Sequence, residues 1–224
     1  MLTAGLPLAG LLLLIMVMGM PAAAQPDSLA NGQDAIECAN LIYAGTKSSV
    51  CFSDTFLSVV SKETTIRASR KFKPVKISDA ELFSYPFAMM TGEGAFSLTP
   101  KERTHLAQYL SRGGFLLASA GCSNKLWDDS FRSEMRRIFP DRPLTAVKKA
   151  HPLFHTVYDI ERLETKTDDA HLEGITIGGK LVVVYSPDGL NDTSTMHGCC
   201  CCGGNEIKNS QQVNANIIVY VLLQ

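Results

Sequence analysis

Four consecutive cysteines near the carboxyl end are the residues of this sequence best suited to chemistry. They lie between glycines in the segment 198–204, which reads GCCCCGG. In a turn, the first and last of the four form a C-x-x-C pair of the kind that clasps soft metals, and the glycines leave the backbone free to form that turn. Thiolates select Cu(I), Zn(II) or iron–sulfur clusters. We therefore predict a site for a soft metal ion, Zn or Cu, formed by Cys199, Cys200, Cys201 and Cys202, with His197 adding an imidazole nitrogen.

Disulfide formation is an equally weighted alternative for the same four residues. The chain has seven cysteines, of which the other three are Cys38, Cys51 and Cys122. Thiols tend to pair in an oxidising compartment, and an odd number leaves at least one thiol free, ligated or reactive. A strained disulfide between neighbouring cysteines would instead be redox-labile. Metal binding, structural disulfides and redox exchange therefore all remain open at this point.

Two further candidate residues follow predicted strands. Glu93 comes after the apolar run 86–91, and Cys122 comes after the apolar run 115–119. The Gly- and Cys-rich loop 186–206 follows a third run, 181–185. The carboxyl ends of parallel strands meet at one edge of a sheet, and ligands collect there. We therefore predict that Glu93, Cys122 and the cysteine run lie at the same edge, with Glu93 and Cys122 as candidate catalytic residues.

The pair His151 and His155 is a weaker candidate for a metal site. Two imidazoles four residues apart share a face on a helix, as in zinc sites. Pro152, however, disfavours helical backbone at His151, and the intervening Leu153 and Phe154 are typical core residues. We expect these histidines to tie a loop to the backbone rather than to bind a metal.

Strands and helices alternate along the chain and must position these residues. Strands are expected at 38–44, 86–91 and 115–119, with a short one within 67–75. The runs 172–177 and 181–185, on either side of Gly178-Gly179, are expected to form a hairpin or two adjacent strands. Helix starts are expected at Ser53-Asp54, at Thr99-Pro100-Lys101-Glu102, which is a capping box, and at Asp128-Asp129. The tail 213–223 is expected to be a closing helix, with a strand as the alternative. This alternation predicts an α/β fold with a mostly parallel sheet covered on both faces.

The first 24 residues have the pattern of a cleavable secretory signal. An apolar run, 8–20, is followed by Ala22-Ala23-Ala24, the small residues that a signal peptidase requires. We predict a signal peptide at 1–24, a flexible arm at 25–36 and a single α/β domain at 37–224 in a periplasmic or secreted protein. The alternative is an uncleaved membrane anchor, although the apolar run is shorter than the roughly 20 residues that a span needs.

Cleavage after Ala24 is directly testable. Amino-terminal sequencing of the exported protein is expected to begin at Gln25. Recovery of intact Met1 on membrane-bound protein would contradict cleavage and would identify an anchor instead.

Composition excludes several classes of partner. The net charge is −1, with 21 basic and 22 acidic residues mixed along the chain. A nucleic-acid-binding face or a polybasic membrane patch would require clustered Lys and Arg. We therefore expect no nucleic-acid partner. Because no segment after residue 24 is long and apolar enough to span a bilayer, we also expect no stable membrane span after cleavage.

Several ordered motifs resemble one protein family. They are ELFSYPF from Glu81, TGEGAFSL from Thr91, YLSRGGFLLA from Tyr109, SFRSEM from Ser130, FPDRPL from Phe139 and HPLFH from His151. Together they resemble the domain of unknown function family 4159, over about 38–224. The resemblance implies a fold like that of class I glutamine amidotransferases, a flavodoxin-like three-layer sandwich, but no established activity. Members often carry Gly-His-Gly where this chain has Gly92-Glu93-Gly94, and the cysteine run is not a general feature of the family.

The implied fold gives Cys122 a second interpretation. In amidotransferase-like folds the nucleophile sits at a sharp turn between a strand and a helix, which is where Cys122 lies. A helix amino terminus raises the reactivity of a thiol, and a base must accept its proton. His151, His155 and His197 are candidate bases. The G-x-C-x-G pattern of such turns is absent, because Cys122 is preceded but not closely followed by glycine.

Three functions are consistent with these observations. The first is an exported metal- or thiol-binding module without turnover, centred on Cys199–Cys202. The second is a hydrolase or transferase that uses Cys122 or a bound metal. The third is an interaction domain of an envelope protein complex, in which the cysteines form structural disulfides.

Overall fold

A computed structural model describes residues 35–49, 51–167, 169–193 and 204–224, together with Met1. The rest of the predicted signal, nearly all of the predicted arm, and the cysteine run with His197 lie outside the described residues. Ile36, within the predicted arm, donates its N–H to the Arg67 carbonyl at 2.8 Å.

The described elements alternate between strands and helices, as the sequence predicts. In chain order they are β1 (Cys38–Tyr43), β2 (Lys47–Ser48), α1 (Thr55–Glu63), β3 (Lys73–Lys76), the 3₁₀ helix η1 (Ala80–Ser84), β4 (Phe87–Gly92), α2 (Pro100–Ser111), β5 (Phe115–Ala120), the single turn η2 (Gly121–Ser123), α3 (Lys125–Ile138), β6 (Thr145–Ala146), η3 (Pro152–His155), β7 (Glu173–Ile177), β8 (Lys180–Ser186) and α4 (Ser210–Leu222).

One sheet runs through the domain, and its centre is parallel. Strands β3, β1, β4, β5 and β8 lie side by side in that order, all parallel. Antiparallel pairs flank them: β2 pairs with β1, β7 with β8, and β6 with β7. The β7–β8 hairpin turns at Gly178 and Gly179, whose positive φ angles of 57° and 82° are typical of a type I′ turn, the two-residue turn favoured between twisted strands. An α/β fold with a mostly parallel sheet is thus confirmed.

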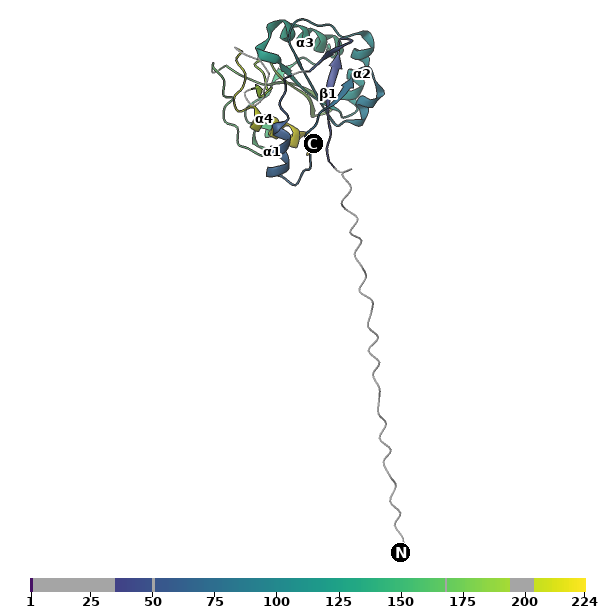
Figure 1. Ribbon diagram of the computed structural model, residues 1–224, viewed down its shortest axis with the longest axis vertical. Helices are drawn as coiled ribbons and strands as arrows, with labels where there is room; N and C mark the ends of the chain where they lie inside the picture. Colours follow the sequence, from purple (N-terminus) through teal and green to yellow (C-terminus); the bar gives the residue numbers. More distant parts are fainter. Residues whose placement is uncertain (2–34, 50, 168, 194–203) are drawn as a thin grey trace. The chain divides into compact units, whose positions relative to one another are not determined.

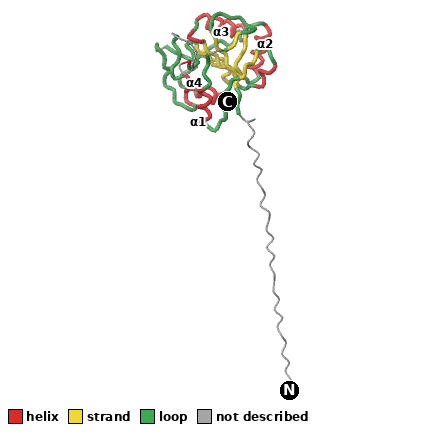
Figure 2. The backbone as a smooth tube through the Cα atoms, viewed as in Figure 1, coloured by secondary structure: helices red, strands yellow, loops and turns green. Residues whose placement is uncertain are grey.

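Helices cover both faces of this sheet (Figures 1 and 2). Helices α2 and α3 pack on one face, where Leu106 and Phe131 join a core cluster with alternate strand residues. Helices α1 and α4 pack on the other, where Phe56 and Ile218 belong to the second cluster. Right-handed crossovers explain why the helices divide between the two faces. Helix α1 connects β1 to β3 in one direction along the sheet, and α2 connects β4 to β5 in the opposite direction, so the two helices lie on opposite faces.

The helix starts were predicted unequally well. The capping box of α2 is confirmed, since Thr99 Oγ accepts the Glu102 N–H at 3.2 Å and Glu102 accepts the Thr99 N–H at 2.7 Å. The start of α3 at Asp128-Asp129 is wrong: the cap is Asn124, whose Oδ1 accepts the Trp127 N–H at 3.1 Å. Asp128 instead accepts hydrogen bonds from Tyr185 of β8 and from Arg132 of the same helix.

The apolar tail forms a helix, which confirms the first of the two predicted alternatives. Residues Val213 to Val219 of α4 are all buried, which is typical of a helix surrounded by other elements rather than of one with a wet face. The side-chain NH₂ groups of its two buried asparagines donate to backbone carbonyls, Asn214 Nδ2 to Leu190 at 2.8 Å and Asn216 Nδ2 to Tyr158 at 2.8 Å. Within the described part of the chain, none of the helices is long and apolar enough to cross a membrane.

Candidate functional site

Cys122 occupies a tight turn between β5 and α3. The Asn124 N–H bonds to the Gly121 carbonyl at 2.9 Å, and the two residues between them have positive φ angles, 52° for Cys122 and 54° for Ser123. This is the geometry of a type I′ turn, whose central positions usually hold Asn and Gly. A Cys-Ser pair there is strained, and such strain persists where the surroundings impose it, often at functional sites.

The thiol of Cys122 faces the carboxylate of Glu93. Cys122 Sγ lies 3.3 Å from Glu93 Oε1, so the thiol donates to the carboxylate across the ends of β5 and β4. The close approach of these strand ends depends on Gly121, because a Cβ there would lie 2.9 Å from the Gly92 carbonyl oxygen. Glu93 is exposed and Cys122 is half-buried, so the pair is open to solvent and to ligands.

Ser123 joins the turn by hydrogen bonds to the loop that follows β8. Its hydroxyl donates to the Asp188 carbonyl at 2.6 Å and accepts the Asn205 N–H at 2.7 Å. Asn205 Nδ2 also bonds to Asp188 Oδ1 at 2.9 Å. Gly204 packs so closely that a Cβ there would lie 2.3 Å from the Cys122 carbonyl oxygen. Gly204 and Asn205, which come after the cysteine run in the sequence, are therefore held against the Cys122 turn.

A buried polar network holds the carboxyl ends of the strands together beneath this site. Asn191 is 1 % exposed, and its Oδ1 accepts the Ser119 hydroxyl at 2.6 Å. Its Nδ2 donates to Thr91 Oγ1 at 3.0 Å and to the Cys51 carbonyl at 3.1 Å. The amide, which follows β8, thus links the last residues of β4 and β5 with the segment that follows β2. Fully satisfied buried networks of this kind rigidify a site.

A charged network forms one flank of the same edge. Arg132 of α3 binds the Glu173 carboxylate through two nitrogens, at 2.7 and 2.8 Å, and Asp128 Oδ1 at 2.6 Å. His171 Nε2 contacts Glu173 at 2.9 Å. Burial alone would raise the pKa of Glu173, but Arg132 outweighs burial and lowers it. Burial likewise lowers the pKa of His171, but the bond to Glu173 outweighs it and raises the value.

The histidine pair is not arranged to bind a metal. His151 caps η3, with its Nδ1 accepting the Leu153 N–H at 3.2 Å. His155 contacts Asp159 through Nδ1 and the Lys149 carbonyl through Nε2 at 2.8 Å. Both imidazoles tie loop segments in place, as the sequence predicts. Neither lies on the elements that carry Cys122.

The described residues supply only part of a metal site. Cys122 and Glu93 come together, but no cluster of three or more His, Cys, Asp or Glu is found in the part of the chain that the structure describes. The predicted ligands Cys199–Cys202 and His197 lie outside the described residues.

Sequence reasoning missed the polar residues that organise this edge. The apolar runs indicate Thr91 and Ser119 only as strand ends, and no sequence pattern singles out Ser123, Asn191 or Asn205. A usable signal was present, since Thr91 and Ser119 are polar residues at the carboxyl ends of otherwise apolar strands. A buried hydroxyl there needs a partner from another strand end.

The fold and the site define an α/β domain with a thiol–carboxylate pair at the carboxyl edge of a mostly parallel sheet. The family model described as "Domain of unknown function (DUF4159)" matches residues 20–222. The chain therefore belongs to this family, as its motifs predict. No curated protein matches the sequence.

Proposed function

We propose that this chain is an exported binding domain for a soft metal ion, held by Cys122 and Glu93 together with thiols of the Cys199–Cys202 run. The observation that carries the proposal is the attachment of the residues after the run to the Cys122 turn. Asn205 bonds to Ser123, and Gly204 lies against the Cys122 carbonyl. Cys202 precedes Gly204 by only two residues in the sequence.

The number of donors favours a shared site. A structural Zn²⁺ takes four ligands from Cys, His, Asp and Glu. The described pair of Cys122 Sγ and Glu93 Oε1 offers two. Two thiols of a C-x-x-C arrangement in the run, Cys199 and Cys202, would complete the set. His197 is a further candidate ligand beside them.

The sheet order supports a flavodoxin-like fold, related to that of class I glutamine amidotransferases, as part of the proposal. Counting only the parallel strands in chain order, β3-β1-β4-β5-β8 is the order 2-1-3-4-5 of flavodoxin-like folds. In such sheets ligands bind beyond the carboxyl ends of the strands, near the point where the order reverses. That point lies between β1 and β4, and Glu93 directly follows β4.

Covalent catalysis by Cys122 is the second candidate function, favoured by the strained turn between β5 and α3. In an acyl transfer, Cys122 Sγ would bond to the acyl carbon, the bond from that carbon to the leaving oxygen would break, and the thiol proton would pass to Glu93. Incubation with a p-nitrophenyl ester followed by mass spectrometry tests this directly. An acyl group on Cys122 that is lost in Glu93→Gln supports it.

Structural disulfides, as in an interaction domain of an envelope complex, are the third candidate. The supporting observation is that Cys51 is disulfide-bonded, whereas Cys38 and Cys122 do not take part in disulfides. A disulfide at Cys51 is compatible with metal binding, provided that enough thiols of the run stay reduced. Free-thiol counting therefore belongs in the test.

Metal content and free thiols, measured on protein purified from its native compartment, test the proposal. We expect stoichiometric Zn or Cu that is released at low pH, because protons compete with the metal for sulfur. Cys122→Ser, Cys199→Ser and Cys202→Ser should each lose the metal, and Glu93→Gln should bind it more weakly. Cys38→Ala is the matched control, because burial raises the pKa of the Cys38 thiol to about 12 and removes it from thiolate chemistry.

Two results would contradict the metal proposal. One is the absence of metal, with every sulfur of the run in a disulfide, which would favour the third candidate. The other is full metal retention in Cys122→Ser, which would place the site elsewhere.

A further inference from the structure

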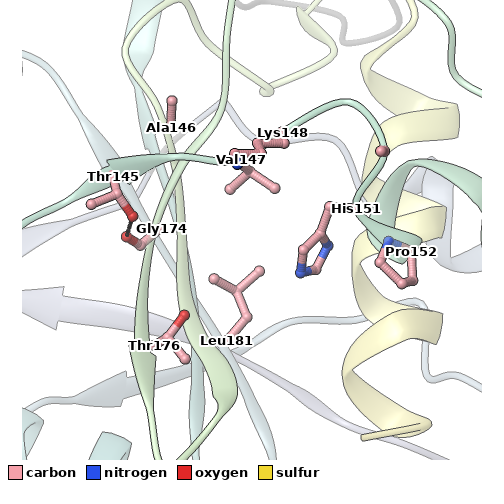
Figure 3. Close-up of a pocket in the computed structure, with 10 residues that line it drawn as sticks. Thr145, Ala146, Val147, Lys148, His151, Pro152, Gly174, Thr176 and Leu181 are labelled. Carbon is pink, nitrogen blue, oxygen red and sulfur yellow. Dashed lines mark hydrogen bonds between the residues drawn. The ribbon is translucent and has the colours of Figure 1, made fainter.

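A cavity lies apart from the thiol site. It has a volume of about 430 Å³ and is lined by β6, the start of η3, and parts of β7 and β8 (Figure 3). Leu181, in its wall, is near the beginning of β8, whereas the thiol site follows the end of that strand. The volume falls within the range of pockets that hold small molecules.

The cavity combines an apolar wall with a few hydrogen-bond donors. Val147, Pro152 and Leu181 contribute apolar surface, and the imidazole of His151 is directed toward the same space (Figure 3). The ring of His151 is held edge-on to that of Tyr220, with centroids 5.1 Å apart. An apolar wall with a small number of fixed polar groups is typical of ligand sites.

The hydrogen bonds of His151 determine what its free nitrogen presents. Its Nδ1 accepts the Leu153 N–H, so in the neutral ring the proton is on Nε2. Burial lowers the pKa of His151, which favours this neutral form. Nε2 thus offers an N–H donor, and no hydrogen bond joins it to another described residue. The Thr176 hydroxyl is a second polar group in the wall.

The charge of the lining favours an anion. Lys148 lines the cavity, and none of the ten lining residues is acidic. A carboxylate accepts hydrogen bonds from both an imidazole N–H and an ammonium group, and such charge-assisted bonds are the strong ones. We propose that this cavity binds a small monocarboxylate with an apolar body, its carboxylate at His151 and Lys148 and its body against Leu181 and Val147.

Titration of the wild-type protein with benzoate and with hexanoate, followed by backbone amide NMR shifts, tests this proposal. Saturable shifts are expected at residues of β6, β7 and η3, with much weaker binding of benzamide and hexanamide, which lack the charge. Lys148→Gln should weaken benzoate binding about tenfold, as expected for the loss of one charge-assisted bond. Lys101→Gln, on the exposed surface of α2, is the matched control and should leave binding unchanged.

Two more variants keep the fold while changing the cavity. His151→Asn retains an acceptor for the Leu153 N–H, since Asn is a good helix cap, but withdraws the Nε2 donor, and should also weaken binding. Ala146→Trp fills the cavity from an exposed position and should abolish binding. Absence of saturable shifts with both carboxylates would overturn the proposal, as would unchanged binding in Ala146→Trp. Equal binding of benzamide and benzoate would overturn the choice of an anion. Metal content is expected to be unaffected in all four variants.

Discussion

Replacing Arg132 by methionine is expected to lower the free energy of unfolding by about 3 kcal/mol, the lower end of the range for removing one partner of a buried ion pair. Arg132 is the main cation for Glu173, which is 7 % exposed, and it also binds Asp128. Methionine keeps much of the aliphatic packing but leaves a nearly buried carboxylate without its guanidinium. Urea denaturation of the variant and the wild type measures the difference.

The pH dependence identifies the cause of this loss. In the wild type the pKa of Glu173 is lowered in the folded state, so its contribution to stability is present above the unfolded pKa and is lost as the pH falls through the folded pKa. Without Arg132, the pKa of Glu173 in the folded state rises because burial disfavours the charged carboxylate. Protonation at lower pH removes the unpaired charge and so stabilises the variant. The difference in the free energy of unfolding between the wild type and Arg132→Met should therefore narrow as the pH is lowered from 7 to about 4, near the unfolded pKa of Glu.

A control on the same helix separates this effect from general loss of charge. Lys125 and Asp129 form an i,i+4 pair whose side chains are 81 % and 57 % exposed. Lys125→Met should change the free energy of unfolding by less than about 1 kcal/mol. An Arg132→Met variant as stable as Lys125→Met at pH 7 would show that the network at Glu173 contributes little.

Gly204→Ala is expected to release bound metal while leaving the fold largely intact. A Cβ at this position would lie 2.3 Å from the Cys122 carbonyl oxygen and 2.4 Å from its carbon, both backbone atoms that cannot rotate away. The segment that follows the cysteine run must then move off the Cys122 turn. We expect metal affinity to fall by at least tenfold, about 1.4 kcal/mol. Metal competition titration and thermal unfolding of the metal-free proteins measure the two effects.

Gly178→Ala is the comparison for this variant. Gly178 has a positive φ of 57° and open space around it, so alanine there strains a distant hairpin without touching the site. It should lower stability modestly and leave metal affinity unchanged. Equal metal affinity in Gly204→Ala and the wild type would show that the residues after the run do not position the ligands.

The core elements were predictable because their signals are local. The strand at Phe115–Ala120 is an apolar run bounded by glycines, and the start of α2 at Thr99 carries a complete capping box. The strands β2 and β6 were not predicted, because two residues are too few to show alternation. The start of α3 was misplaced because Asp128 has the chemistry of a cap, whereas in the folded protein it accepts hydrogen bonds from Tyr185 of β8 and from Arg132 one turn along the same helix.

The site was partly predictable for a similar reason. Residues that follow parallel strands meet at one edge, so placing Glu93 near Cys122 required only the order of strands and loops. The left-handed turn at Cys122 and the bonds from Ser123 to Asp188 and Asn205 join residues far apart in the chain. No local pattern encodes such pairings, so the support of the thiol emerges only from the folded structure.

The proposal that Cys122, Glu93 and the cysteine run hold one metal ion is tested most directly by X-ray absorption at the zinc edge of the zinc-loaded protein. The predicted shell combines sulfur at about 2.3 Å with at least one oxygen or nitrogen at about 2.0–2.2 Å. Cys122→Ser should remove one sulfur from that shell and weaken binding, while Cys38→Ala should leave the spectrum unchanged. A spectrum identical in the wild type and Cys122→Ser would contradict a shared site at this edge of the sheet.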